Sequence, residues 1–164
     1  MTRKSAFPPV ADHATRVLIL GSLPGEASLA AARYYAHPQN QFWRLVGGAL
    51  DQNIAALDYD RRLAALAAAG IGLWDTVASA VRQGSLDGAI REIELSALAD
   101  LAARLPALRA VAFNGATAAR IGRRQLPADG HLALLDLPSS SPAYCRIALA
   151  QKQECWNLLR KFLA

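Results

Sequence analysis

"RVLILGS", residues 16–22, is the stretch that decides the fold. It is a short run of branched apolar residues closed by glycine, which is typical of a strand buried on both faces of a parallel sheet. Similar runs occupy 71–77 and 108–115, and another begins at residue 131. Predicted helices separate these runs, and this alternation indicates a parallel sheet covered on both faces. We therefore expect an α/β fold with about four strands.

The segments between and after the strands predict helices. The segment 58–70 offers Asp58 as N-cap and Gly70 as stop. The segment 91–105, "REIELSALADLAARL", repeats apolar residues at helical spacing and predicts one amphipathic helix. Further helices are expected over 38–50, 116–124 and 145–164, the last anchored by Trp156, Leu159 and Phe162.

Length and composition indicate one globular domain. The chain has 164 residues, of which 53% are hydrophobic, so a full core can be buried. We expect a single domain over 1–164, with residues 1–15 as a candidate flexible N-terminal arm. The formal charge of +5 comes mostly from arginine, which suits a phosphate-bearing partner. Arginine and alanine enrichment at neutral surface sites is the alternative explanation.

The cysteines and histidines exclude the common metal centres. Two cysteines, Cys145 and Cys155, form no CxxC pair, and the three scattered histidines complete no zinc pattern. An iron–sulfur cluster usually needs four cysteine ligands. No signal peptide or membrane-spanning segment is expected, and two free thiols predict a reducing, cytoplasmic location.

Polar motifs recur where the predicted strands end. These motifs are "GSLPG" (21–25), "WD" (74–75), "FNG" (113–115) and "LPSSSPAY" (137–144). In open α/β sheets, ligands bind beyond the carboxyl ends of the strands, so these motifs are expected to line one cleft. "GSLPG" matches neither the P-loop nor the GxGxxG fingerprint.

"YYAHPQNQFW", residues 34–43, places four aromatic rings among amides directly after the first of these loops. Flat rings beside amides suit a planar heterocycle, because a ring stacks on a base face and an amide reads its edge. The alternative is that the rings anchor the loop and helix to the core. We expect that alternative for Phe42 and Trp43, which lie at helical spacing with Val46.

At this point the sequence resembles a family. "GSLPGEASLAAARYYAHPQNQFW" (21–43) and "LPSSSPAY" (137–144) resemble the two signature motifs of the uracil-DNA glycosylase superfamily. Within it, the chain is most similar to the hypoxanthine-DNA (deoxyinosine) glycosylase branch, as "GLWDTVASAVRQGSLDGAI" (72–90) and "FNGATA" (113–118) also indicate.

The resemblance implies a three-layer α/β/α sandwich with a short central parallel sheet. It implies a monofunctional DNA N-glycosylase that flips out a deaminated base, hypoxanthine in deoxyinosine, and hydrolyses its N-glycosidic bond. It also implies that the protein uses no metal or cofactor, acts as a monomer on DNA containing deaminated bases, and does not bind membranes. Two alternatives stay open: mainly uracil or xanthine specificity, or a non-catalytic nucleic-acid or nucleotide-binding module on the same fold.

The resemblance places Asn40 in the catalytic position, where its amide would orient the attacking water. The alternative is that Asn40 caps the helix that starts there. Leu23 stands where the best-known uracil enzymes have Asp or Asn, and Leu137 replaces a His or Asn of other branches. Both departures argue against efficient uracil excision and keep the non-catalytic alternative open.

The resemblance also implies a base pocket. Tyr35 would stack on the flipped base, with core packing as the alternative. Asn114 would read the base edge, or simply form an Asn-Gly turn. Asp75 would read the base or cap the next loop, and His37 would hold its loop or touch the base. The loop residues Gly21, Ser22, Leu23 and Pro24 are expected to line the same pocket.

The Pro/Ser loop is the expected DNA contact. Its candidate residues are Ser139, Ser140, Ser141, Pro142, Tyr144 and Arg146. Backbone N–H groups and hydroxyls here would grip the phosphates beside the flipped nucleotide. Ser141 occupies the place of the family's bulky wedge but is small, so Tyr144, Arg146 or no residue fills the gap in the duplex. Further arginines expected near this end are Arg120, Arg123 and Arg124.

Overall fold

The computed structural model describes residues 3–128 and 130–164, and its centre is a four-stranded parallel sheet. The strand order is β3 (Ile71–Asp75), β2 (Val17–Gly21), β6 (Ala110–Asn114) and β7 (Ala133–Leu137). The α/β fold with about four parallel strands, as predicted from the pattern of apolar runs, is confirmed. In register, Gly21 lies opposite Asp75, and Asn114 opposite Leu137, so the predicted polar motifs meet at one edge.

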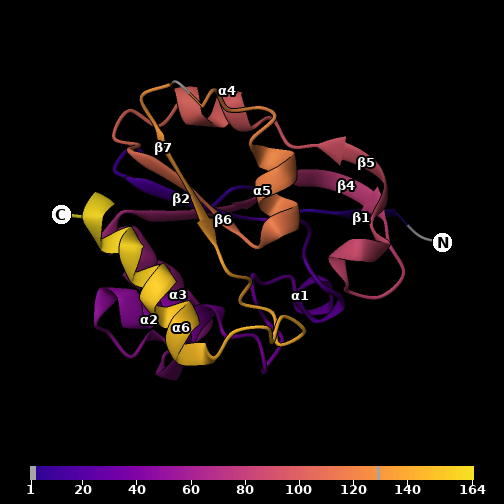
Figure 1. Cartoon of the computed structure of the whole chain (residues 1–164), viewed down its shortest axis with the longest axis horizontal. Helices are drawn as coiled ribbons and strands as arrows, with labels where there is room; N and C mark the ends of the chain where they lie inside the picture. The colour runs from indigo at the N-terminus through magenta and orange to yellow at the C-terminus, as the bar shows by residue number, and fades with distance from the viewer. Residues whose placement is uncertain (1–2, 129) are drawn as a thin grey trace.

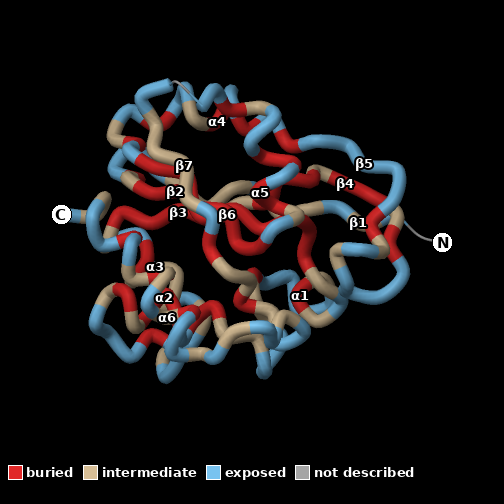
Figure 2. Tube along the Cα trace, in the orientation of Figure 1, coloured by how far each residue is buried: buried red, intermediate tan, exposed pale blue. Residues whose placement is uncertain are grey.

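Alternation of side chains along the strands builds two apolar clusters, one on each face of the sheet. On one face, Val17 and Ile19 pack with α2 (Phe42–Leu50), α3 (Tyr59–Ala69) and α6 (Leu149–Trp156). On the other face, Leu18 and Leu20 pack with α4 (Leu98–Ala103) and α5 (Ala116–Gly122). Figure 1 shows these helices on opposite sides of the strands, and Figure 2 shows the strands largely buried between them. The fold is therefore the three-layer sandwich.

Helix ends and thiols follow the sequence at several points. The Asp58 side chain accepts the Arg61 N–H at 2.9 Å and caps α3, and Gly70 stops it in the left-handed conformation with φ 84°. The tail forms α6 followed by a 3-10 helix, η3 (Asn157–Phe162), with Trp156 and Leu159 fully buried. Cys145 and Cys155 are free. The described residues contain no helix long and apolar enough to cross a membrane.

The predicted amphipathic helix over 91–105 is wrong in its first half. Arg91–Leu95 forms β5, whose five residues are all exposed, and only Leu98–Ala103 is helical. In "REIEL" the charged and apolar residues alternate, which is the period of a strand. Ile93 and Leu95 are 40% and 52% exposed, so they are not the buried helix face that the spacing predicted.

A second, antiparallel sheet of order β1-β4-β5 flanks the central one. The predicted strand over 71–77 breaks at Thr76, where β3 ends and β4 (Val77–Val81) begins. The first strand of this second sheet, β1 (Arg3–Ser5), lies within the expected N-terminal arm and pairs with β4. Val10, in the same arm, forms an isolated β-bridge with Leu73. The arm is thus held by backbone hydrogen bonds over these residues rather than hanging free.

Short helices fill the remaining connections. The helix α1 (Glu26–Ala31) directly follows the "GSLPG" loop. The glycines and proline of this loop predict irregular structure through residue 28, so the chain becomes helical earlier than the pattern indicates. Two 3-10 helices, η1 (Ile54–Ala56) and η2 (Asp87–Ala89), precede α3 and β5. Residues 82–90, between β4 and β5, contact the loop that follows β2: Arg82 donates to the Leu23 carbonyl, and the Ser22 hydroxyl donates to Asp87.

Candidate active site

A cavity of about 270 Å³ lies at the carboxyl ends of the parallel strands. It brings together most of the site residues predicted from the sequence: Gly21, Ser22, Leu23, Pro24, Tyr35, His37, Asn40, Asp75, Asn114, Ser139, Ser140, Ser141 and Pro142. Tyr144 and Arg146 are not among its lining residues. Both motif loops therefore face one space, as the position of the motifs at the strand ends predicted.

A close approach of Gly21, Asp75 and Tyr35 forms the floor of this cavity. A Cβ atom on Gly21 would lie 2.7 Å from Asp75 Oδ1 and 3.3 Å from Tyr35 Oη. Real Cβ atoms almost never lie within 3.0 Å of another atom, so any larger residue at this strand end would require the Asp75 carboxyl group to move. The absence of a side chain at Gly21 lets the carboxyl and the phenol converge over the same point.

A chain of hydrogen bonds joins the two motif loops through Asn114 and Ser140. The Asn114 amide donates to Ser140 Oγ at 2.9 Å, and its oxygen accepts the Ser140 N–H at 2.9 Å. The Ser140 hydroxyl donates to Asn40 Oδ1 at 2.8 Å, and Asn114 Nδ2 lies 3.4 Å from Tyr35 Oη. Asn114 is the last residue of β6, and Gly115, with φ 99°, is the N-cap of α5, so the position is a strand end leading into a helix rather than the Asn-Gly turn considered from the sequence. Both ends of the Asn114 amide are therefore used inside the protein.

Asn40 both lines the cavity and supports the start of α2. Its Oδ1 accepts the N–H of Phe42, the first residue of α2, at 2.9 Å, in addition to the Ser140 hydroxyl. The N-cap of α2 is Gln41, so Asn40 is not the cap that the sequence suggested, although its side chain holds the helix start from one residue earlier. His37, in the same loop, accepts the Gln39 N–H on Nδ1 at 3.1 Å, which is the loop-holding role considered for it.

Tyr35 offers one ring face to a ligand. Its other face stacks on Phe42, with ring centroids 3.8 Å apart and planes 10° apart. Its backbone has φ 51°, a left-handed conformation that is costly for a residue with a bulky side chain. Burial raises the pKa of the phenol, so it stays a neutral hydrogen-bonding group. Phe42 and Trp43 are buried in the core, as expected from their spacing.

The Pro/Ser loop is tied down from within. The Ser139 and Ser141 hydroxyls accept the N–H groups of Ser141 and Ala143, at 3.1 and 3.2 Å. Beneath the loop, the buried Lys152 donates to Gln41 Oε1 at 2.8 Å and lies 3.4 Å from the Ser141 carbonyl. Burial lowers the pKa of this lysine. Lys152 lies in α6, and no pattern in the sequence marks it as part of the site.

Three carboxyl groups line the cavity, those of Glu26, Asp75 and Asp87; Glu26 pairs with Lys4, and only Asp75 was predicted. Burial, and then the negative charge of Asp87, raise the pKa of Asp75 to about 7, against the opposing effect of Arg82. Burial also raises the pKa of Asp87, although its bond from the Ser22 hydroxyl and the Arg82 charge oppose this. Asp87 lies in η2. In the sequence, the dipeptide "DG" (87–88) indicates only a loop.

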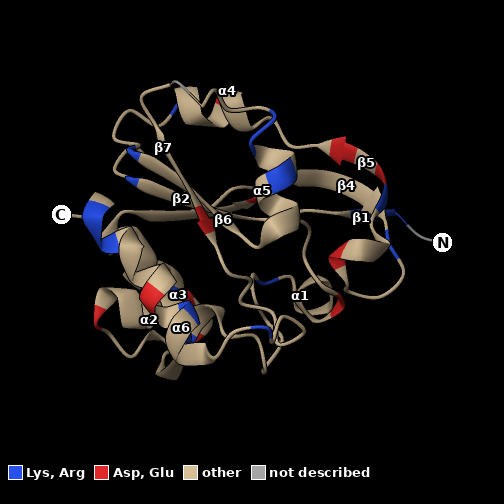
Figure 3. Cartoon of the chain, in the orientation of Figure 1, with Lys and Arg blue, Asp and Glu red and all other residues tan. Residues whose placement is uncertain are grey.

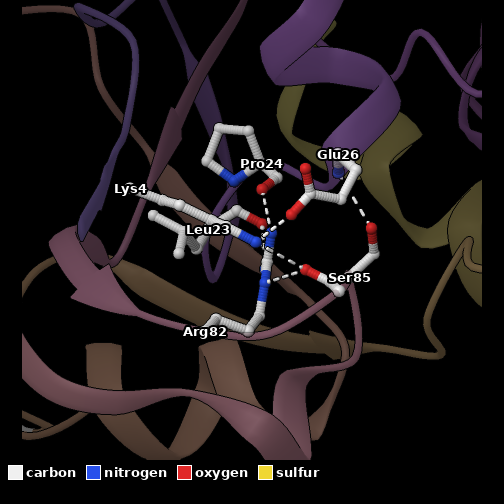
Figure 4. Close-up of polar contacts among 7 residues, drawn as sticks. Lys4, Leu23, Pro24, Glu26, Arg82 and Ser85 are labelled. Atoms are coloured by element: carbon white, nitrogen blue, oxygen red, sulfur yellow. Dashed lines mark hydrogen bonds and ion pairs between the residues drawn. The ribbon is translucent and has the colours of Figure 1, made fainter. Parts of the chain in front are cut away.

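A strap formed by residues 82–90 closes one side of the cavity, and Arg82 pins it. Arg82 is 2% exposed and donates to the carbonyl oxygens of Leu23, Pro24 and Gly84. Figure 4 shows its guanidinium between the strap and the "GSLPG" loop, with the Lys4–Glu26 ion pair alongside. The Glu26 N–H donates to the hydroxyl oxygen of Ser85 at 2.8 Å. "VRQGS" reads as an ordinary surface turn, so this buried arginine was missed.

Comparison with known proteins agrees with this arrangement. The family model of the uracil DNA glycosylase superfamily matches residues 8–160. The chain belongs to the uracil DNA glycosylase superfamily. It is 42% identical over 113 residues, 69% of this chain and 72% of the relative, to "Hypoxanthine DNA glycosylase" of Methanosarcina barkeri (strain Fusaro / DSM 804). It is 42% identical over 112 residues, 68% of this chain and 71% of the relative, to the protein of the same name in Methanosarcina acetivorans.

A solved structure is similar to this chain over nearly its whole length. The solution NMR structure of a candidate uracil DNA glycosylase from Methanosarcina acetivorans superposes with a TM-score of 0.86 at 35% identity. The match covers 98% of this chain and 99% of that one. The family resemblance inferred from the two motifs is thereby confirmed.

The two departures from the superfamily's usual residues are both buried apolar side chains. Leu23 lines the cavity but packs with Val77, Ala80 and Ile90. Leu137 is part of the core beside α2 and is not a lining residue. Neither side chain can donate to or accept from a ligand, so polar contacts to a base must come from other lining groups. Among the described residues, no three His, Cys, Asp or Glu side chains lie where they could hold a metal ion.

Replacing Asp75 by Asn is expected to stabilise the protein near pH 8 but not near pH 4. The folded pKa of about 7 lies above the value of about 3.9 for an unfolded aspartate, so the folded state binds the proton more tightly. The free energy of unfolding of the parent therefore falls as the pH rises between these values. Asp75→Asn escapes this loss, which reaches at most about 4 kcal/mol at about 1.4 kcal/mol per pKa unit. Urea unfolding across this range measures the difference, and a difference that does not vary with pH would contradict the raised pKa.

Replacing Arg82 by Met is expected to destabilise the strap. The Leu23 and Pro24 carbonyl oxygens lose a buried charged donor, whereas that of Gly84 keeps Lys4; groups left unsatisfied in a buried place cost about 1–3 kcal/mol each, so we expect about 3 kcal/mol in all. The amides of residues 82–90 should also exchange faster with deuterium. Arg61→Met, which removes an exposed arginine, is the control and should change the free energy of unfolding by less than about 0.5 kcal/mol. Equal effects of the two variants would show that Arg82 does not hold the strap.

Proposed function

We propose that this chain is a DNA glycosylase that excises hypoxanthine from DNA carrying deoxyinosine. The observation that carries the proposal is the hydrogen-bonded chain from Asn40 through Ser140 and Asn114 to Tyr35, which fixes both motif loops around one cavity. The relatives named hypoxanthine DNA glycosylase support the choice of base. A base inside the duplex cannot reach such a cavity, so the nucleotide has to be flipped out first.

Within the cavity, the ring of Tyr35 is the platform for the flipped base. Phe42 covers one face of this ring, so the base stacks on the opposite face. Fixing the base in this way holds the glycosidic bond in one direction relative to Asn40. None of the described lining residues is a lysine whose amine could attack the sugar, so water is the proposed nucleophile.

Asn40 is the group proposed to orient that water. The water has to donate to Oδ1, which now accepts the Phe42 N–H and the Ser140 hydroxyl. The backbone bond holds the amide in place, whereas a hydroxyl hydrogen can rotate away. A water would then donate to Asn40 Oδ1 in place of the Ser140 hydroxyl. The hydrogen bond from the Phe42 N–H already holds this oxygen, so it sets the direction of the water.

Asn40→Ala should lower the single-turnover rate of excision by about two to four orders of magnitude. It also removes a helix-supporting bond, so a loss of about 1 kcal/mol in the free energy of unfolding is expected with it. Asn40→Asp is the matched control, because a carboxylate still accepts from the Phe42 N–H and from a water. We expect Asn40→Asp to keep the parent's stability and to be more active than Asn40→Ala.

The comparison of these variants separates the candidate functions. If the rates of both variants follow their stabilities, Asn40 only supports the helix start. If the parent binds deoxyinosine duplexes but releases no base, the chain is a non-catalytic binding module on this fold, the alternative that Leu23 and Leu137 kept open. Parallel substrates carrying uracil and xanthine measure the base preference.

DNA is proposed to contact the rims on the two sides of the cavity. Ser139 to Pro142 form one rim, and the strap forms the other, with Leu86 at 64% exposure among the lining residues. Tyr144 and Arg146, the two wedge candidates from the sequence, do not line the cavity. We assign the wedge to Leu86, because an exposed leucine on a pinned strap can fill the gap that a flipped nucleotide leaves.

Much of the positive charge is engaged elsewhere. Arg16, Arg109 and Arg160 donate to backbone carbonyls of the chain, and Arg123 pairs with Asp136. Figure 3 shows Lys and Arg spread from β1 to the C-terminal end. Neither Arg120 nor Arg124 lines the cavity. Most arginines are nevertheless exposed, so the net charge of +5 supports a nucleic-acid partner through surface arginines outside the cavity.

Leu86→Ala should reduce excision from duplexes about tenfold or more, and leave excision from single strands unchanged. Burying a leucine side chain is worth about 1.5–3 kcal/mol, and a single strand has no gap to fill. Leu158→Ala is the control, since Leu158 is also exposed but lies in η3, away from the cavity. An equal loss on both substrates would assign Leu86 to the base pocket instead of the wedge.

A further inference from the structure

A second cavity lies beside the candidate active site, and the proposed function does not use it. It has a volume of about 330 Å³, and Tyr34 and Tyr35 line both cavities, which makes them neighbours. Its remaining walls come from the end of α1, the loop after it, and residues between 57 and 62 at the start of α3. Two of the lining residues are arginines, Arg33 and Arg62. Two like charges repel each other within one cavity, so their presence there indicates a ligand of opposite charge.

An aromatic ring supports each guanidinium group. Arg33 Cζ lies 5.2 Å from the centre of the Tyr59 ring, and Arg62 Cζ lies 5.3 Å from the centre of the Trp43 ring. The two rings lie edge to face, with centroids 6.1 Å apart. A ring holds the flat face of a guanidinium group, whereas the N–H donors point outward from its edge. The two groups are therefore held on neighbouring rings with their donors available.

Most of these donors have no acceptor among the residues that the structure describes. Arg62 donates from Nη2 to the Ala55 carbonyl at 2.7 Å, and its buried Nε has no hydrogen-bond partner in the described chain. Arg33 is exposed, and none of the ion pairs of the described residues includes it or Arg62. Each arginine carries five N–H donors, and a phosphate accepts two parallel bonds from one such group. A phosphate is thus the anion that this pair of arginines fits.

Asp58 is the acidic residue of the second cavity, and its charge is directed elsewhere. Its Oδ1 accepts the Arg61 N–H at 2.9 Å, and its Oδ2 lies 3.7 Å from Arg61 Nε. The second cavity therefore keeps an excess of positive charge. The active-site cavity, by contrast, is lined by three acidic residues and by no lysine or arginine of the described chain. The two neighbouring cavities suit the two parts of a nucleotide, because one repels a phosphate and the other attracts it.

The backbone around Arg33 is fixed in a costly conformation. Ala32 and Tyr35, on either side of it, have φ values of 52° and 51°, in the left-handed region that residues with a side chain seldom adopt. The Tyr34 N–H donates to Tyr59 Oη at 3.0 Å, so Tyr59 holds both the loop and the Arg33 guanidinium group. Strained backbone of this kind is concentrated at ligand sites, where it fixes a side chain before the ligand binds.

We propose that Arg33 and Arg62 bind a phosphate of the DNA strand that carries the flipped nucleotide. This inference rests on the proposed function, which supplies the ligand. The base stacks on Tyr35, and Tyr35 also lines the second cavity. Phosphates of one strand succeed one another about every 3.4 Å along the duplex axis, so one beside the flipped nucleotide reaches the second cavity. The site is a third contact with the backbone, in addition to the two rims.

Trp43 connects this phosphate site to the base platform. Its ring supports Arg62, and its Nε1 donates to the Tyr35 carbonyl at 3.1 Å. A phosphate held by Arg62 is thus fixed relative to the ring on which the base stacks. Fixing both groups orients the sugar between them, which lowers the entropic part of the barrier to reaction.

The test replaces single phosphates by uncharged methylphosphonates on either side of the deoxyinosine. Binding is measured with the 2′-fluoro analogue of deoxyinosine, whose glycosidic bond resists hydrolysis. For the parent, we expect at least one position at which the replacement weakens binding about tenfold, because a charged hydrogen bond is lost. In Arg33→Gln, the replacement at that position should have no further effect, since the partner is already gone. If every position weakens binding of the parent and of Arg33→Gln by the same factor, the inference is overturned.

Salt dependence provides a second measurement on the same variant. Loss of one phosphate contact should reduce the slope of log K against log salt concentration by about 0.9. We expect this reduction in Arg33→Gln, whose exposed side chain can be replaced without unfolding the protein. Arg104→Gln is the control, because it removes the same charge from the end of α4, on the other face of the sheet. An equal reduction in both variants would attribute the effect to net charge and overturn the inference.

Excision and free phosphate separate the possible failures. If a position that depends on Arg33 is found but the parent releases no base from deoxyinosine duplexes, the proposed function fails and the inference stands. If the parent excises hypoxanthine and no position depends on Arg33, the inference fails and the function stands. Inorganic phosphate, the other source of the same group, is titrated into the parent. If it shifts the NMR signals of Arg33 and Tyr59 while no position in the DNA depends on Arg33, the site takes free phosphate, and DNA as its ligand is overturned.

Discussion

The double hydrogen bond between Asn114 and Ser140 is the constraint on which the site depends. One residue ends the central strand β6 and the other belongs to the Pro/Ser loop, 26 positions later in the chain. The same serine reaches Asn40, so a single clamp sets the positions of both motif loops. Buried and fully satisfied networks of this kind are rigid, because each alternative geometry leaves a polar group unpaired. The cavity is thus defined by the loops' attachment to the sheet, not by the loops themselves.

The sequence predicted the central sheet, because that depends on local apolar runs. It also predicted the place of the site, because ligands of open α/β sheets generally bind beyond the carboxyl ends of the strands. "RVLILGS" and its counterparts are buried on both faces of the sheet. Few structures other than a central strand of a parallel sheet bury such a short apolar run completely. It failed at "REIEL", where the same residues fit a helical and an alternating pattern, and pairing with β4 decided between them. That choice depends on a strand elsewhere in the chain, so no local pattern contains it.

For the candidate site, too, the sequence predicted some residues and missed others. Asn40, Tyr35 and Asp75 follow strand ends or a recognisable motif, and the structure gathers them as expected. Arg82 and Asp87 were missed, because their roles arise only when the strap folds back over the "GSLPG" loop. Asn114 was found, but its assignment as a base reader overlooked that its amide is needed to hold Ser140. Sequence patterns thus located the polar groups but not their competing hydrogen-bond partners.

The cavity of this basic protein is lined by three acidic residues, Glu26, Asp75 and Asp87, which is the reverse of what phosphate binding alone would favour. Most described arginines near the core instead hold carbonyl oxygens, as Arg82 does beneath the strap. A cationic cavity would attract the phosphate backbone into the place of the base, whereas buried carboxyl groups of raised pKa exclude it. They cost the fold stability, which is a common feature of residues kept for function. The separation of charge therefore sorts the two parts of a nucleotide: phosphates stay at the rims, and only the uncharged base enters.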